Sequence, residues 1–390
     1  MILRQHNVFL LAVTQALMQT AVVMSVAVGS VMGNVLAENE RLATLPIALL
    51  IIGTAVASLP AGLAMRRWGR KAVFVVGALI GMTGSLVAAT GLSQGSFLLF
   101  ASGHFFLGAY QGIANYYRFA AVESEGNTTS GHAISWVVAG GLVAAFLGPA
   151  LGQWGRDWIP HQLFVGSYVA QALLSVVALI VLSQLAPCSI RSLEASGSAR
   201  SLRELLGQPV LQATIFCTAA GYSVMVMVMT ATPLAMLGCG LSESSVTPVI
   251  QWHVVGMFAP SFFAGPLIAR FGAPRVMQLG FMLFVGHILI VLLGIEFLHF
   301  LSALILLGVG WNFVFVAGTA LLTQTYRPAE QAKVQTVNEF AVFGLVAVST
   351  LSAGWLHEQF GWAGLNLALF PLLLMAAIAM HRFGGHTALK

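Results

Sequence analysis

A sixteen-residue segment occurs twice in this chain, and the two copies begin 203 positions apart. Residues 58–73 and residues 261–276 share six identical positions: Ser58/Ser261, Ala61/Ala264, Gly62/Gly265, Arg67/Arg270, Gly69/Gly272 and Val73/Val276. In each copy an apolar stretch ends at a glycine, a short turn follows, and a second apolar stretch begins. A repeat separated by about half the chain predicts two copies of one structural unit.

Long apolar stretches fill most of the remaining sequence. Hydrophobic residues make up 58% of the chain and charged residues 7%, whereas roughly a quarter of a soluble domain is charged. A helix needs about 20 apolar residues to cross a bilayer. Stretches close to this length occupy residues 8–33, 43–65, 72–92, 97–117, 132–154, 163–185, 210–237, 244–269, 275–298, 300–323, 337–356 and 362–380. They predict an all-α membrane protein with twelve transmembrane helices.

The basic residues are distributed unequally between the two sides of this arrangement. Of the 17 Lys and Arg residues, only Arg41 and Arg156 fall in connections on the side opposite the termini. The positive-inside rule therefore predicts that both termini are cytoplasmic. Because membrane orientation explains the net charge of +5, we expect no nucleic-acid partner.

The longest polar stretch divides the chain near its middle. It predicts an N-terminal six-helix half over residues 1–186, a cytoplasmic linker over 187–209 and a C-terminal six-helix half over 210–390. Within the linker, residues 202–206 alternate leucines with charged residues. This pattern fits either a short amphipathic turn on the membrane surface or a plain loop.

The first copy of the repeat resembles a loop signature of the major facilitator superfamily. The signature, Gly-x-Leu-Ala-Asp-Arg-x-Gly-Arg-Lys, lies between helices two and three of that superfamily, and Gly62, Arg67, Gly69, Arg70 and Lys71 match it in register. By topology the resemblance covers the whole chain. It implies two pseudo-symmetric six-helix bundles, alternating access and a location in the bacterial inner membrane.

One position departs from the signature, because Arg66 stands where the superfamily has an acidic residue. We expect Arg66 either to pair with Glu339 near the start of helix eleven or to anchor the inner face. Glycines permit close helix approach, and cations bridge helix carboxyl ends and lipid phosphates. The residues of both copies that we expect to control the access states are Gly62, Arg66, Arg67, Gly69, Arg70, Arg270 and Gly272.

A second resemblance, to the drug:proton antiporters of that superfamily, rests on helix five. Their pattern there is Gly-Pro-x-x-Gly-Gly, and Gly148, Pro149 and Gly152 match it. These residues permit a kink and tight packing, and we expect them to act in the conformational change. Gly108 replaces the helix-four arginine of the antiporters. The resemblance implies proton-coupled efflux, while the missing arginine leaves uptake or uniport of a metabolite open.

Polar residues recur along the fourth apolar stretch. His104, Gly108, Gln111, Asn115 and Arg118 are three or four positions apart, which places them on one side of a helix. Polar side chains inside a membrane are costly and mark a pathway or a partnered contact. The resemblance places helices one and four at the central cavity of the superfamily.

The expected cavity combines aromatic and polar side chains, which suit an amphipathic organic substrate. We expect Trp311 and Asn312 to occupy in helix ten the places of Tyr110 and Gln111, at an offset of 201. The residues that we expect to line the cavity are Gln15, Gln19, His104, Gln111, Asn115, Tyr222, Trp311 and Asn312.

Two ionisable residues are candidates for coupling transport to a proton. His104 has an unperturbed pKa close to neutral pH, although a neutral packing histidine explains the same residue. Glu339 is the next candidate.

A tyrosine and an arginine followed by an acidic residue occur near the inner ends of helices four and ten. We therefore expect Arg118 and Arg327 to form paired inner gates. Their expected partners are Glu123, Glu330 or the carboxyl ends of helices.

No nucleotide-binding, metalloprotease or nucleophile-elbow motif occurs in the sequence. Cys188, Cys217 and Cys239 show no metal-ligand or disulfide spacing. We therefore expect no catalytic site, no cofactor and no metal. The sequence predicts a secondary active transporter that moves a small organic molecule, with proton-coupled efflux as the first hypothesis. A metabolite importer or uniporter is the alternative, a membrane-embedded enzyme or receptor is a distant one, and the oligomeric state is left open.

Overall fold

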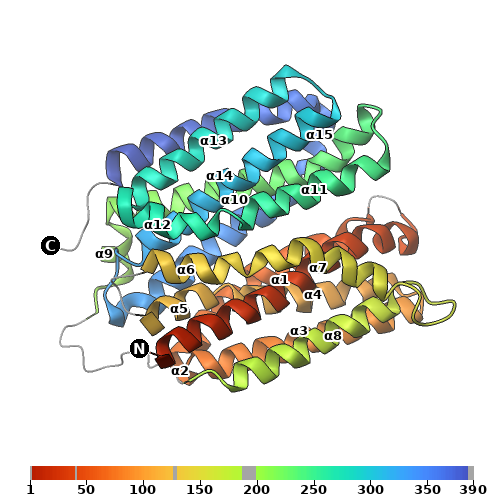
Figure 1. Cartoon of the computed structure of the whole chain (residues 1–390), viewed down its shortest axis with the longest axis horizontal. Helices are drawn as coiled ribbons and strands as arrows, with labels where there is room; N and C mark the ends of the chain where they lie inside the picture. Colours follow the sequence, from red (N-terminus) through yellow and green to blue (C-terminus); the bar gives the residue numbers. More distant parts are fainter. Residues whose placement is uncertain (1, 40–41, 126–129, 187–198, 385–390) are drawn as a thin grey trace. The chain divides into compact units, whose positions relative to one another are not determined.

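The computed structural model describes residues 2–39, 42–125, 130–186 and 199–384. The regular structure of these residues is helical, and they contain no strand (Figure 1). Eleven of their helical segments are long and apolar enough to cross a membrane. The last of them contains two of the predicted stretches and is interrupted at Gly361, whose φ is 66°. The predicted all-α membrane fold is confirmed.

The helices group into two units by their mutual contacts. Unit 1 comprises Met1–Asn127 and Val143–Ile190, and unit 2 comprises Thr128–Leu142 and Arg191–Lys390. The helices of unit 1 are α1 (Ile2–Leu36), α2 (Leu45–Trp68), α3 (Arg70–Ser93), α4 (Phe97–Ala114), α5 (Tyr117–Glu125), α7 (Gly141–Trp154) and α8 (Val165–Ser183). The helices of unit 2 are α6 (Ser130–Ala139), α9 (Leu202–Leu206), α10 (Pro209–Gly238), α11 (Glu243–Phe258), α12 (Ser261–Phe271), α13 (Ala273–Leu293), α14 (Phe297–Leu322), a 3-10 turn (Pro328–Glu330) and α15 (Gln331–Phe383).

Three predicted helices are interrupted within their apolar stretches. Residues 97–117 divide into α4 and α5, where Arg118 Nη1 donates to the Asn115 carbonyl over 2.6 Å. Gly140 separates α6 from α7, and Pro260 lies between α11 and α12. Glycine weakens a helix, and proline lacks the N–H that the helix needs. The hydropathy of the sequence does not indicate such breaks, because the residues on both sides of each break are apolar.

The repeated segment forms the same turn in both units. Gly69 joins α2 to α3 with φ 80° and ψ 164°, and Gly272 joins α12 to α13 with φ 84° and ψ 149°. Their N–H groups donate to the carbonyls of Met65 and Ile268 over 3.0 and 2.8 Å. Only glycine adopts this conformation without strain. The expectation of a tight glycine turn is confirmed in both copies.

Close contacts between helices show the register of the two copies. Gly108 of α4 lies against the Leu50 carbonyl of α2, and Gly308 of α14 lies against the His253 carbonyl of α11. Leu50 and His253 are 203 positions apart, but the two glycines are 200 apart. The predicted offset of 201 for helix ten is therefore wrong by one residue. It changes because α13 has 21 residues and α3 has 24.

The described ends of the central connection are bound to different units. Asn7 of α1 holds Ala186 through two amide contacts, with Ala186 N–H donating to Asn7 Oδ1 over 3.1 Å and Asn7 Nδ2 lying 3.5 Å from the Ala186 carbonyl. After the gap, Ser201 and Glu204 cap α9 reciprocally, and Leu205 is buried. The predicted turn therefore forms as a short helix, and its place on the membrane surface stays a prediction. Residues 187–198, with Cys188, and Arg41 lie outside the described residues.

Candidate functional site

His104 lies inside unit 1 between α1, α4 and α8. It is fully buried, and its Nδ1 lies 3.0 Å from the Phe100 carbonyl. Its Nε2 lies 3.0 Å from the Tyr168 hydroxyl and 3.3 Å from the Ser25 carbonyl. Gln171 of α8 extends this network by donating to Ser25 Oγ over 2.9 Å. Since both ring nitrogens are engaged, these surroundings suit a packing histidine, and proton coupling through His104 stays a prediction.

The predicted polar face of α4 divides between different neighbours. His104 faces α1 and α8, whereas Gln111 meets α2, where Thr54 Oγ1 donates to Gln111 Oε1 over 3.2 Å. Asn115 follows the last residue of α4, and its Nδ2 has no hydrogen-bonding partner among the described residues. These residues therefore do not form one continuous polar cluster within unit 1.

The two glutamines expected on helix one are half-buried in α1. Gln15 and Gln19 make no hydrogen bond to another described residue. Their place in the substrate cavity therefore stays a prediction.

A buried ion pair lies at one end of unit 1, where α3 begins. Arg70 Nε donates to Glu123 Oε2 over 2.6 Å, and Arg70 Nη2 contacts the other carboxylate oxygen. The predicted partner of Glu123, Arg118, instead contacts a helix carboxyl end, which was the other expectation for it. Arg70, the buried first residue of α3, therefore pairs with Glu123 in place of Arg118. The spacing of these residues in the sequence does not indicate which arginine forms the pair. Arg66 and Arg67 are exposed.

A second ion pair joins the central connection to unit 2. Glu330 is fully buried, and its Oε1 accepts from the backbone N–H and Nε of Arg200 over 2.9 and 2.8 Å. Its Oε2 accepts from Arg200 Nη2 over 2.7 Å and from the Arg327 backbone N–H over 2.9 Å. The hydrogen bond to this carboxylate raises the pKa of the Arg200 guanidinium, which therefore stays charged. Glu330 thus pairs with the side chain of Arg200 and not with the predicted side chain of Arg327. The sequence analysis did not identify Arg200.

Five aromatic side chains pack together in unit 2, and we call them the aromatic cluster. Trp311 stacks on Phe315 with ring centres 4.8 Å apart. Tyr222 stands edge-on to Trp311 at 5.2 Å, and Phe258 does so at 5.8 Å. Phe343 meets Tyr222 at 5.2 Å. The cluster joins α10, α11, α14 and α15, and brings together the predicted residues Tyr222 and Trp311.

Asn312 lies on another side of α14 and holds the break between α11 and α12. Its Nδ2 donates to the Met257 carbonyl and to Ser261 Oγ, both over 2.6 Å. The break between α11 and α12 leaves the Met257 carbonyl without its helix donor, and the Asn312 amide bonds it instead. Asn312 therefore has a structural role in addition to its expected place in the cavity.

The remaining predicted residues lie apart from these clusters. Glu339 is fully buried in α15 and accepts from Asn338 Nδ2 over 2.9 Å. Arg66 belongs to the other unit, so its pairing with Glu339 stays a prediction. Gly148 lies in α7, beside Pro149, against the Val23 side chain of α1. The other three residues are Gly62 and Gly152, which are buried, and Arg270, which is exposed.

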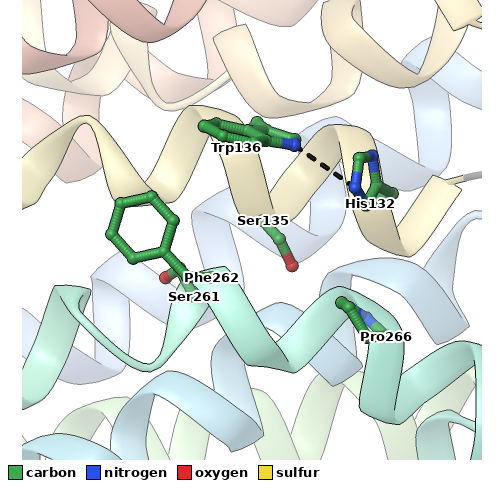
Figure 2. A pocket seen from close by; sticks show the side chains of 6 residues that line it. All are labelled: His132, Ser135, Trp136, Ser261, Phe262 and Pro266. Atoms are coloured by element: carbon green, nitrogen blue, oxygen red, sulfur yellow. Dashed lines mark hydrogen bonds between the residues drawn. The ribbon is translucent and has the colours of Figure 1, made fainter.

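A small pocket opens between α6 and α12 in unit 2 (Figure 2). Trp136 Nε1 donates to His132 Nε2 over 3.3 Å at its edge, and Ser135 Oγ is buried there without a partner among the described residues. The lining residues are His132, Ser135, Trp136, Ser261, Phe262 and Pro266. It contains no expected cavity residue. No group of three potential metal ligands gathers in the described part of the chain.

Comparisons with known proteins agree with this architecture. Residues 8–259 match the sequence profile of the Major Facilitator Superfamily. The riboflavin transporter RfnT of Brucella anthropi is 39% identical over 378 residues, covering 96% of this chain and 95% of RfnT. The proton:xylose symporter XylE has a similar fold, with a TM-score of 0.82 at 13% identity over 97% of this chain and 95% of XylE. The transporter FucP in its outward conformation gives 0.77 at 14% identity over 96% of this chain and 98% of FucP.

None of these three proteins is named as a drug:proton antiporter, so the narrower resemblance to that group stays a prediction. The matched profile covers more than half of the chain, and the relative at 39% identity covers nearly all of it. The chain therefore belongs to the Major Facilitator Superfamily and is a membrane transport protein rather than an enzyme.

Proposed function

We propose that this chain carries riboflavin, or a closely related flavin, across the bacterial inner membrane. The proposal rests on the likeness to RfnT, which extends over 96% of the chain at 39% identity. That likeness favours transport of a metabolite, the alternative raised by the sequence, over efflux of drug-like compounds.

Candidate residues of unit 1 offer amides and those of unit 2 offer an aromatic surface, and each kind suits one part of a neutral molecule that combines an aromatic ring with hydroxyl groups. Gln15, Gln19, Gln111 and Asn115 carry amides, which both donate and accept hydrogen bonds. The aromatic cluster supplies a surface against which a planar ring packs. Riboflavin has an uncharged tricyclic ring and an uncharged polyhydroxyl chain, so its recognition needs such groups and no ion pair.

Transport proceeds in this proposal by alternating access without hydrolysis of ATP. Glu339 is the first candidate for binding a coupling proton, because it is a fully buried carboxyl group inside an apolar helix. His104 is the second. The change between access states involves the glycine turns at Gly69 and Gly272 and the ion pair of Arg70. Both termini lie on the cytoplasmic side.

Purified protein in liposomes tests the proposal directly. Labelled riboflavin should cross into these vesicles faster than into protein-free vesicles, and excess unlabelled riboflavin should compete. An imposed proton gradient should cause accumulation against the riboflavin gradient, and a protonophore should abolish it.

Equal rates with and without protein would reject flavin transport. The efflux alternative would then be examined in inside-out vesicles with a panel of organic cations. If the protein speeds riboflavin entry but a proton gradient causes no accumulation, the chain transports flavin as a uniporter and not by proton coupling.

A further inference from the structure

We propose that Trp311 recognises the flavin ring, by donating its indole N–H to a ring carbonyl oxygen within an aromatic surface that it shares with Tyr222. This inference rests on the proposed function. It goes further by naming the side chain that distinguishes a flavin from other neutral solutes.

The position of Trp311 within the aromatic cluster is the first support. Its side chain is 3% exposed, with Phe315 stacked parallel to its ring and Tyr222 and Phe258 set at nearly right angles to it. Aromatic rings prefer these two arrangements. A flavin ring that joins such a cluster meets surfaces already oriented for stacking and edge contact.

The unsatisfied indole nitrogen is the second support. Trp311 Nε1 is buried and has no hydrogen-bond acceptor among the described residues. The indole N–H is a donor only, and nearly all buried donors in proteins have an acceptor. The flavin ring carries carbonyl oxygens at C2 and C4 on its polar edge. One of these oxygens supplies the acceptor that the protein lacks.

Tyr222 provides the route by which a ring reaches Trp311. It contacts Trp311, Phe315 and Phe343, and it is half-buried, whereas the other four members of the cluster are buried. In this proposal the Tyr222 side chain rotates and exposes the edge of the indole. A bound ring then takes the place of the phenol against Trp311.

The internal repeat indicates that the fold itself does not require an aromatic residue at position 311. With the offset of 200 given by the glycine contacts, Trp311 corresponds to Gln111 of unit 1. Gln111 is half-buried and accepts a hydrogen bond from Thr54. The same place in the same helix pair thus accommodates an amide in one unit, and we attribute the indole in the other unit to binding.

Titration of the purified protein with riboflavin tests the inference. Trp311→Phe replaces the indole by a smaller aromatic ring that has no N–H. We therefore expect the dissociation constant of riboflavin to rise about tenfold, the equivalent of one hydrogen bond. Trp252→Phe is the matched control, since Trp252 is 51% exposed on α11 and lies outside the cluster. It should leave the constant unchanged.

Two further readouts separate recognition from a loss of packing. In the wild type, a riboflavin analogue with sulfur in place of the carbonyl oxygen at C2 or C4 should bind more weakly than riboflavin. In Trp311→Phe the two compounds should bind equally well. An adjacent indole quenches flavin fluorescence by electron transfer, so riboflavin bound to Trp311→Phe should fluoresce more strongly than riboflavin bound to the wild type.

The outcomes distinguish the two levels of the argument. If the wild type binds no riboflavin, the proposed function fails. If the wild type binds riboflavin and Trp311→Phe binds it with the same constant, analogue preference and fluorescence, Trp311 does not recognise the ring, and flavin transport stands without it.

Discussion

Removing the Arg200 side chain tests how firmly the central connection is held to unit 2. Arg200→Ala deletes the Nε and Nη2 contacts to Glu330 and leaves that carboxylate with two backbone N–H donors. Hydrogen bonds to a charged group contribute roughly 1.5–3 kcal/mol, and breaking a buried ion pair costs roughly 3–5 kcal/mol. Arg200 itself is 23% exposed, so water replaces part of the loss. We therefore expect a cost of about 2 kcal/mol, or about a 30-fold rise in the detached population.

Amide hydrogen exchange measures this detachment. The amides of α9 and the following turn, including those of Leu205 and Gly207, bond to carbonyls within the segment. In lipid nanodiscs their protection should fall about 30-fold in Arg200→Ala, while α13 should exchange as in the wild type. Arg200→Lys retains the positive charge but not the bidentate contact with Glu330, so protection of these amides should be intermediate.

Arg203→Ala is the control, because Arg203 is exposed on the same short helix. Unchanged exchange in Arg200→Ala, or an equal loss of protection in Arg203→Ala, would refute the conclusion that the Glu330 pair holds this segment.

Three other substitutions follow from the described contacts. Gly272→Ala should lower stability by about 1–3 kcal/mol, because its φ of 84° excludes a side chain, whereas Gly354→Ala in open space should not; thermal unfolding compares the two. Glu339→Gln should abolish riboflavin accumulation driven by a proton gradient, and His104→Gln should retain it; accumulation in both variants would remove Glu339 as the coupling site. Asn312→Ala should cost about 1–3 kcal/mol by freeing a buried carbonyl, with unchanged denaturation as the contrary result.

The sequence predicts the fold well because long apolar stretches and a repeated glycine turn are local signals. Each of the twelve stretches is mostly helical, and Gly69 and Gly272 take the same conformation. The interruptions at Asn115 and Pro260 were not predicted, since hydropathy does not distinguish one long helix from two short ones. The repeat register was wrong by one residue, because similar neighbouring residue pairs concealed a three-residue difference in helix length.

The candidate site was predicted less completely, because it depends on which side chains meet across helices. Glu123 pairs with Arg70, and Glu330 pairs with Arg200. Several arginines follow each carboxylate or precede it in the sequence, and only the folded chain selects among them. Tyr222 and Trp311 were predicted together, since aromatic residues are conspicuous in apolar helices. Their contact through Phe315 and Phe343 required the structure.

The bond between Asn7 and Ala186 has a consequence for the order in which the protein is made. It joins residues 179 positions apart, one in the first helix of unit 1 and one just after its last helix. During translation the pair cannot form until residue 186 has left the ribosome, and by then most of unit 2 has not been synthesised. Since domains fold as units from the N-terminus, we expect this contact to close the first bundle during synthesis, before the second bundle is complete.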